Sequence, residues 1–346
     1  MYRATFTAGL ALVFALPATA QQTSDIVVPE PETNVAQEFS GISDAATAAL
    51  TAKGEGRPVN ADNWMVAAAH PLAVEAGANV LRDGGNAADA MVAVQAVLGL
   101  VEPQSSGLGG GAFLVWYDAA TGELTTLDAR ETAPLAADPR YFLDDDGAPL
   151  DFMTAVVSGR SVGTPGTPKL MEEAHRRWGQ ANWRGLFDAA IALADDGFTV
   201  SPRLADSVAS AADSLAAFPA TADYFLPDGA PLAVGDNLSN PDYADTLRQI
   251  ATQGTAAFYT GDIAADIVAA TRTDENPGLL SLADLAQYRV IERPVVCYDY
   301  RGADVCGMGP PSSGAVAVSQ ILGMLENFDL PAMDPTDPET RRLMGD

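Results

Sequence analysis

The stretch that decides the fold runs from Gln104 to Pro134 and reads QSSGLGGGAFLVWYDAATGELTTLDARETAP. It begins with a glycine-rich loop. Two runs of strand-forming residues follow, Ala112–Tyr117 and Leu124–Leu127, joined by a turn at Asp118–Gly122. The stretch ends with Arg130, an arginine flanked by acids. We expect the loop and the strands to hold Arg130 in a pocket.

Arg130 has two interpretations from its residues alone. A guanidinium is planar and makes two parallel hydrogen bonds with one carboxylate, so Arg130 is a candidate anchor for a carboxylate ligand. The other interpretation is a structural ion pair with Asp128 or Glu131, which lie within two positions of it. The local pattern favours the ion pair and leaves both interpretations open.

The glycine run Gly107–Gly111 is not a dinucleotide-binding fingerprint. That fingerprint needs the order strand, glycine loop, helix, whereas here a helical pattern precedes the glycines and a strand pattern follows them. Two explanations remain. The glycines form a tight bend that only glycine can adopt, or they let a ligand or another chain approach the backbone closely.

Charge restricts the possible partners of the protein. Among 346 residues, 46 acids face 19 bases, which gives a formal net charge of −27. A chain this acidic repels phosphate backbones, so the sequence predicts no binding to nucleic acid. No stretch is long and apolar enough to predict a membrane span.

The usual catalytic and metal-binding patterns are missing. The two histidines, His70 and His175, offer little material for a Ser-His-Asp triad. We expect His70 to cap or pack at a strand–helix junction, and His175 to be solvated on a charged helix. No His/Cys/Asp cluster has the spacing of a zinc site, and no phosphate-binding lysine motif occurs. The sequence therefore predicts no metal and no cofactor.

The chain has two cysteines, Cys297 and Cys306, in VVCYDYRGADVCGM. They flank a turn at Asp299–Ala303, so a hairpin would bring them close together across two strands. A disulfide and a pair of inert thiols both fit this arrangement. Metal binding or nucleophilic catalysis would need partner residues that the neighbourhood lacks.

Three segments make up the predicted organisation. Residues 1–20 read as a signal peptide, with Arg3, an apolar run over Ala8–Leu16 and an A-x-A cleavage site at Ala18–Ala20. Residues 21–60 read as a flexible linker because they show no sustained apolar pattern. Residues 61–346 form the folded domain. We expect an exported protein, periplasmic or secreted.

Within the folded domain, strand and helix patterns mix without a regular βαβ rhythm, which favours an α+β fold. The sequence predicts a short buried strand at Met65–Ala69 and a hairpin of Val290–Tyr300 with Ala303–Met308. It also predicts a buried helix that opens at PPSSG (Pro310–Gly314) and continues to Leu325.

Four stretches carry a family resemblance. In order they are MVAAAHPLAVEAGANVLRDGGNAADAMVAVQAVLGLVEP from Met65, SGLGGGAFLVWYDAATGELTTLDARETAP from Ser106, GTPG from Gly163 and GPPSSGAVAVSQILGMLENFD from Gly309. Each alone is weak, but their order and spacing together are specific. The chain resembles the large-subunit half of the gamma-glutamyltransferases, also called glutathione hydrolases, over essentially residues 60–346.

The resemblance implies an N-terminal-nucleophile hydrolase fold, an αββα sandwich of which this chain holds only the large-subunit part. In that family the precursor cuts itself, and the freed N-terminal threonine of the small subunit attacks the gamma-glutamyl amide of glutathione. The glutamyl group then passes to water or to an amino acid or peptide. The arginine of the RETAP motif, here Arg130, binds the α-carboxylate of the donor.

The sequence ends before the motif that opens the small subunit, so the resemblance assigns no catalytic residue to this chain. We expect it to be inactive alone and to need the small subunit of the same precursor as its partner. Two alternatives remain. One is a related acylase of the cephalosporin acylase kind, and the other is a non-catalytic chain that binds a carboxylate or pairs with a separate subunit.

Overall fold

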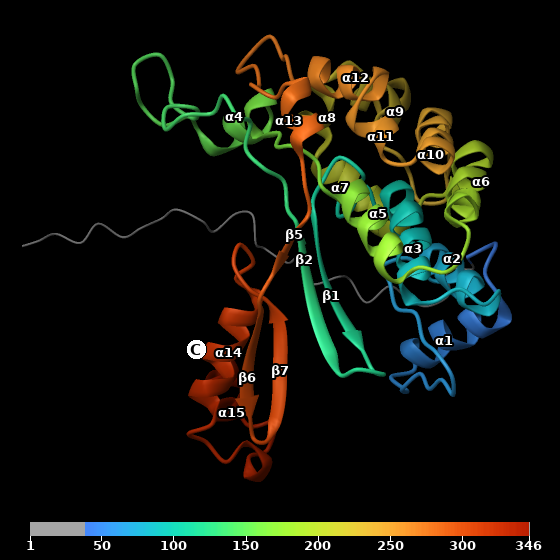
Figure 1. Cartoon of the computed structure of the whole chain (residues 1–346), viewed down its shortest axis with the longest axis vertical. Coiled ribbons are helices and arrows are strands. Elements are labelled where there is room, and N and C mark those ends of the chain that lie inside the picture. Colours follow the sequence, from blue (N-terminus) through green and yellow to red (C-terminus); the bar gives the residue numbers. More distant parts are fainter. Residues whose placement is uncertain (1–38, 346) are drawn as a thin grey trace, which may run out of the picture. The chain divides into compact units, whose positions relative to one another are not determined.

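The computed structural model describes residues 39–345 (Figure 1). The expected signal peptide and the first part of the expected linker lie outside the described residues. The strands are β1 (Ala112–Asp118), β2 (Glu123–Ala129), β3 (Phe198–Thr199), β4 (Asn237–Leu238), β5 (Ile291–Arg293), β6 (Val295–Tyr300) and β7 (Ala303–Met308). The helices are α1 (Asp44–Gly54), α2 (Pro71–Arg82), α3 (Ala87–Val101), α4 (Phe152–Val156), α5 (Thr167–Trp178), α6 (Asp188–Asp196), α7 (Pro202–Ser210), α8 (Ala212–Ala216), α9 (Pro219–Phe225), α10 (Pro241–Gln253), α11 (Ala256–Tyr259), α12 (Asp262–Ala270), α13 (Leu282–Gln287), α14 (Gly314–Leu325) and α15 (Pro338–Gly345). Short 3₁₀ turns occur at η1 (Gly159–Ser161), η2 (Trp183–Phe187), η3 (Pro227–Gly229) and η4 (Leu330–Ala332).

The expected flexible linker over residues 21–60 is wrong for the part that forms α1. Ser43 caps this helix by accepting a hydrogen bond from the Ala46 N–H at 3.3 Å. The Ser43 N–H and hydroxyl donate to Glu75 of α2 at 3.0 and 2.7 Å. A search for apolar periodicity misses α1 because it buries only Ala52. Its stability comes instead from alanine content, the cap and the Ser43–Glu75 contact.

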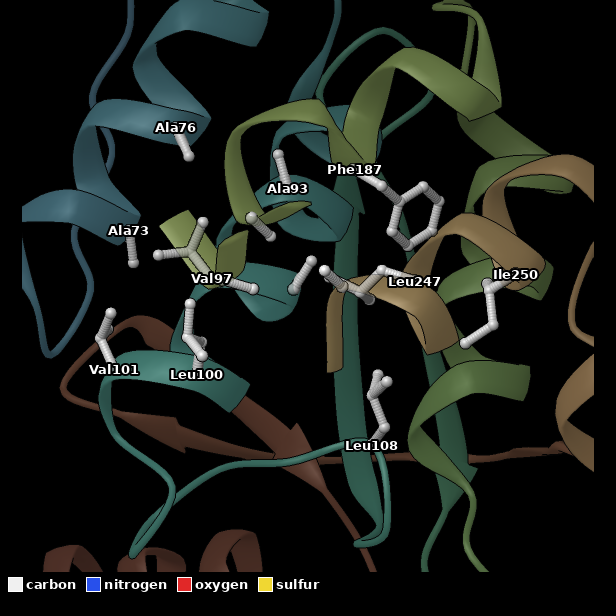
Figure 2. Close-up of a cluster of buried hydrophobic side chains, with 14 of the residues drawn as sticks. Ala73, Ala76, Ala93, Val97, Leu100, Val101, Leu108, Phe187, Leu247 and Ile250 are labelled. Atoms are coloured by element: carbon white, nitrogen blue, oxygen red, sulfur yellow. The ribbon is translucent and has the colours of Figure 1, made fainter. Parts of the chain in front are cut away.

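The main core lies where α2 and α3 pack against α5, α6, α7 and α10. Asn86 starts α3 with a capping box: its side chain accepts from the Asp89 N–H, and Asp89 accepts from the Asn86 N–H. Helix α3 is apolar on most sides and largely buried. The side chains labelled in Figure 2 belong to this core: Ala73, Ala76, Ala93, Val97, Leu100, Val101, Leu108, Phe187, Leu247 and Ile250.

A three-stranded antiparallel sheet with the order β1-β2-β5 lies beside this core. Helix α5 covers one face through Leu170, which packs on Leu127 and Ala129 of β2. The single strand expected over Val290–Tyr300 is divided in two. Pro294 has no N–H to donate to a ladder, so β5 pairs with β2 while β6 pairs with β7 in a separate hairpin. The mixture of small antiparallel sheets and helices confirms the α+β prediction.

Two expectations about burial fail within the described residues. Met65–Ala69 forms no strand and is largely exposed, because no neighbouring strand pairs with it. Helix α14 has no buried residue, and Val316, Ile321 and Met324 are exposed along it. One face of β1 is also open to solvent through alternate apolar residues. These exposed surfaces have the apolar composition that is usual for a protein core.

In the β6–β7 hairpin, Cys297 and Cys306 are directly opposite each other and form a disulfide, with Cα atoms 4.1 Å apart. Reduced thiols and a metal site are therefore not needed to explain the pair. No helix among residues 39–345 has the length and apolar character to cross a membrane.

The two histidines have structural contacts. His70 is the N-cap of α2, and its Nδ1 accepts from the Leu72 N–H at 3.2 Å. His175 is not the solvated residue that its charged neighbours suggest. Its Nε2 lies 3.0 Å from the Ala181 carbonyl oxygen and 3.5 Å from the buried Asp89 carboxylate. The position of these contacts, between the end of α5 and the start of α3, cannot be read from a single helix.

We predict that His70 makes stability depend on pH. Burial lowers the pKa of His70 from 6.5 to about 4. Between these values the unfolded chain binds a proton that the folded chain does not, so stability falls as the pH falls from 6.5 towards 4. Between pH 7 and pH 5 the loss from His70 is about 2 kcal/mol.

Urea unfolding of the wild type and of His70→Asn at both pH values measures this loss. Asn retains a side-chain acceptor for the cap but does not titrate, so its stability should fall less on acidification. Equal losses in the two proteins would contradict the prediction.

Candidate functional site

Arg130 is positioned by the end of the β1–β2 hairpin. The ladder closes at the pair Ala112 and Ala129, so Arg130 is the first residue beyond the sheet. Ala129 and Leu127 are fully buried, which fixes the end of β2, whereas Arg130 itself is exposed. The strand thus brings an accessible guanidinium to the rim of a rigid element.

Three hydrogen bonds hold Arg130 in place. Its backbone N–H donates to Asp128 Oδ1 at 2.9 Å, and its carbonyl oxygen accepts from the Tyr288 hydroxyl at 2.9 Å. Its Nη1 donates to the carbonyl oxygen of Pro311 at 3.1 Å. Pro311 follows a cis peptide bond with Pro310, in the segment that links β7 to α14. The last part of the chain therefore meets the RETAP segment at this arginine.

The structural ion pair that the local pattern favours is not formed. Asp128 pairs instead with Arg293 of β5, whose Nε lies 2.7 Å from Asp128 Oδ2. Glu131 accepts a hydrogen bond from the Gly111 N–H at 2.6 Å. Within residues 39–345, no acidic side chain makes an ion pair with Arg130. Both neighbouring acids have other partners, and the hydrogen bond that the Arg130 guanidinium makes within the described residues goes to a neutral carbonyl oxygen.

The glycine run is explained by contacts inside the chain. None of its glycines has a positive φ, so it is not a bend restricted to glycine. A Cβ on Gly111 would lie 2.5 Å from Glu131 Oε2 and 2.8 Å from the Ala129 carbonyl oxygen. The close approach that the sequence left open thus involves the RETAP segment, and at Gly111 it involves neither a ligand nor another chain.

The GTPG segment, Gly163–Gly166, contacts the RETAP segment through its backbone. The Thr164 N–H donates to the Thr132 carbonyl oxygen at 2.8 Å. The Gly166 N–H donates to the Gly110 carbonyl oxygen at 2.9 Å. A Cβ on Gly166 would lie 1.9 Å from the Ala129 carbonyl oxygen and 2.2 Å from the Tyr288 hydroxyl. The RETAP segment (Arg130–Pro134) and the residue before it therefore contact two glycine segments, Gly107–Gly111 and Gly163–Gly166, which also hydrogen-bond to each other.

The side chains of Tyr259, Tyr288 and Asp284 hydrogen-bond to the backbone of these segments. Tyr288 and Tyr259 stack with ring centroids 5.9 Å apart, and Tyr259 donates to the Pro165 carbonyl oxygen at 2.8 Å. Burial raises the pKa of both phenols, so each remains a hydrogen-bond donor at neutral pH. Burial also acts to raise the pKa of Asp284, but hydrogen bonds from Ser281 and the Leu135 N–H outweigh it and lower that pKa.

Asp284 accepts the Leu135 N–H at 2.6 Å and so fixes the end of the RETAP segment. The same side chain completes the capping box of α13 with Ser281. Among residues 39–345, no group of three His, Cys, Asp or Glu side chains is placed to hold a metal ion. The candidate site is therefore an exposed arginine whose backbone is held by hydrogen bonds, an arrangement that can bind and orient an anion.

Known proteins share this arrangement of segments. The profile of the Gamma-glutamyltranspeptidase family matches residues 73–345. The glutathione hydrolase proenzyme of Bacillus subtilis strain 168 is 39% identical over 282 residues, which cover 82% of this chain and 48% of the relative. The chain thus belongs to the gamma-glutamyltranspeptidase family, in its large-subunit portion. It spans about half the length of the curated relatives it matches.

Solved structures agree with the family and the fold. The crystal structure of Helicobacter pylori gamma-glutamyltranspeptidase superimposes with a TM-score of 0.79 at 35% identity, covering 83% of this chain and 82% of that chain. A cephalosporin acylase from Bacillus halodurans superimposes with a TM-score of 0.68 at 29% identity, covering 83% and 54%. The fold is therefore that of the N-terminal-nucleophile hydrolases to which these proteins belong.

Sequence reasoning singled out Arg130 but missed the residues that hold it. Arg293 lies in the short strand β5, which pairs with β2. It is 165 positions away from Asp128 in sequence. Tyr288 and Pro311 also reach Arg130 only through the tertiary fold. The one available signal was the run Ile291–Arg293 before Pro294, which indicates a strand that ends at that proline.

We predict that adding a methyl group at Gly166, where the GTPG segment packs against the end of β2, destabilises the fold. Gly166→Ala should lower the free energy of unfolding by about 1–3 kcal/mol, because its Cβ would meet backbone that cannot move freely. Gly109→Ala is the matched control, since a Cβ there has no atom within 4 Å; its effect should stay within about 0.5 kcal/mol. Urea unfolding measures both, and equal effects would contradict the packing argument.

Proposed function

We propose that this chain is the donor-recognition half of a gamma-glutamyltransferase, or glutathione hydrolase, and that Arg130 binds the α-carboxylate of the gamma-glutamyl donor. One observation carries the proposal. The Arg130 guanidinium is exposed, its hydrogen bond goes to a neutral carbonyl oxygen, and no acid among residues 39–345 pairs with it.

The free hydrogen-bonding capacity of Arg130 fits a carboxylate. A guanidinium has five N–H groups in a planar fork, and the bond to Pro311 uses one of them. The remaining N–H groups suffice for two parallel bonds to one carboxylate. Because the backbone of Arg130 is held at both its N–H and its carbonyl, the arginine gives up little backbone freedom when a ligand binds.

In the proposed reaction this chain binds and orients the donor. Family membership supports a threonine nucleophile on the small subunit, which attacks the gamma-glutamyl carbonyl carbon. The amide nitrogen leaves with a proton, and water or an amine then takes the glutamyl group. His70 and His175 take no part, because one caps α2 and the other joins the end of α5 to Asp89 and Ala181.

The partner we propose is that small subunit, seated on the open face of β1 and on α14. Phe113, Val115 and Tyr117 alternate along β1 and are 37%, 48% and 60% exposed. Strand β1 is at the edge of its sheet, so its outer backbone groups are free to pair with another strand. The relatives are named proenzymes and are about twice as long as the matched part, which supports a second polypeptide produced from one precursor.

We also propose that the protein is exported. The signal-peptide pattern in residues 1–20 and a disulfide between Cys297 and Cys306 both fit an oxidising compartment.

The first test is ligand binding to the 346-residue chain. Calorimetry should detect glutathione binding, and γ-aminobutyryl-cysteinylglycine, which lacks only the α-carboxylate of the glutamyl residue, should bind more weakly. Arg130→Ala should weaken glutathione by about ten- to a hundredfold, the value of a charged hydrogen-bonded pair, and should bind the two ligands equally. Arg130→Lys should fall in between, because lysine keeps the charge and loses the fork.

Arg184→Ala is the matched control, because Arg184 is an exposed arginine in η2. It should bind like the wild type. An unchanged affinity for glutathione in Arg130→Lys and Arg130→Ala would remove the proposed role of Arg130.

The second test concerns the missing half of the reaction. The chain alone should release no p-nitroaniline from γ-glutamyl-p-nitroanilide. Adding the polypeptide that corresponds to the unmatched half of the Bacillus subtilis relative should produce release. Val115→Glu in β1 or Ile321→Glu in α14 should abolish it, because each places a charge on the proposed interface. Release by the chain alone would contradict this division of labour.

A further inference from the structure

Asp128 is one of the two acids beside Arg130 in sequence that could pair with its guanidinium. It lies two positions earlier in the chain, its carboxylate accepts the Arg130 N–H, and it is only 6% exposed. A buried carboxylate without a cationic partner is costly, and an arginine side chain within reach is the simplest remedy. The structure supplies a different remedy, because Asp128 Oδ2 lies 2.7 Å from Arg293 Nε.

Arg293 is held rigidly for this task. It pairs with Thr126 across the β2–β5 ladder, and the Thr126 hydroxyl donates to the Arg293 carbonyl oxygen at 2.7 Å. Pro294 follows and ends β5. The two strands therefore fix the arginine backbone beside Asp128, so the ion pair does not depend on a mobile loop.

We propose that Arg293 is a positioning residue for the donor site, which keeps Arg130 available by neutralising Asp128. Without Arg293, Asp128 would have an unpaired charge beside the Arg130 backbone. It would draw the Arg130 guanidinium towards itself and repel an incoming donor carboxylate. Both effects pass through Asp128, so removing its charge as well should cancel the defect. The inference rests on the proposed function, because it assigns a supporting role at the same site.

The test is the calorimetric comparison of glutathione with γ-aminobutyryl-cysteinylglycine, on the full chain. Arg293→Gln should weaken glutathione about tenfold and leave the analogue unchanged, since only glutathione has the α-carboxylate. The double variant Asp128→Asn with Arg293→Gln should return to within about threefold of the wild type, because a neutral asparagine at this position keeps the acceptor for the Arg130 N–H without the charge. Arg293→Lys should bind nearly as the wild type does.

Arg177→Gln is the matched control. Arg177 pairs with Glu292, the neighbour of Arg293 on the opposite face of β5, and with Glu173. Its removal also breaks ion pairs at this strand but should leave both affinities unchanged.

Four results would overturn the inference: Arg293→Gln binding like Arg177→Gln, an equal loss for both ligands, a double variant that stays weak, or an Arg293→Lys variant as weak as Arg293→Gln. The proposed function fails separately, if Arg130→Ala leaves glutathione binding unchanged.

Discussion

The position of Arg130 depends on the backbone contacts between Ala129, at the end of β2, and two glycine segments, Gly107–Gly111 and Gly163–Gly166. Gly166 approaches the Ala129 carbonyl so closely that a Cβ would lie 1.9 Å from that oxygen, and Gly111 approaches it from the other segment. Hydrogen bonds from the Gly166 and Thr167 N–H groups to the Gly110 carbonyl tie the two segments together. Because close-packed backbone has no freedom to shift, the residue after Ala129 has a defined position. Arg130 is that residue.

The chain combines a buried hydrophobic core with apolar surfaces that remain exposed. The buried core of α2, α3, α5, α6, α7 and α10 is complete and supports one face of the β1–β2–β5 sheet. The opposite face of β1 and one side of α14, with Val316, Ile321 and Met324, remain apolar and exposed. A monomer rarely leaves large apolar surfaces open without a function. Strand β1 pairs with β2, which ends at Ala129 beside Arg130, so the open face of β1 and the proposed donor site belong to one hairpin.

The sequence allowed prediction of local features and failed on those that need a partner in space. The His70 cap of α2 and the β1–β2 hairpin depend on neighbours in sequence, and both are present. The same local reasoning favoured an ion pair of Arg130 with Asp128 or Glu131, which is wrong. Asp128 pairs with Arg293 instead, and Glu131 accepts a hydrogen bond from the Gly111 N–H. The Met65–Ala69 strand failed for a related reason: an apolar run becomes a strand only where another strand accepts its hydrogen bonds.

With 46 acids and 19 bases, the protein has many carboxylates that could pair with Arg130. The two acids that flank Arg130 in sequence, and Asp284 at the end of the RETAP segment, all have other hydrogen-bond donors. Asp128 has Arg293, Glu131 has the Gly111 N–H, and Asp284 has Ser281 and the Leu135 N–H. Two of these three acids accept hydrogen bonds from uncharged donors. Asp128 alone needs a cation, because it is the acid that also holds the Arg130 backbone and cannot move away from it.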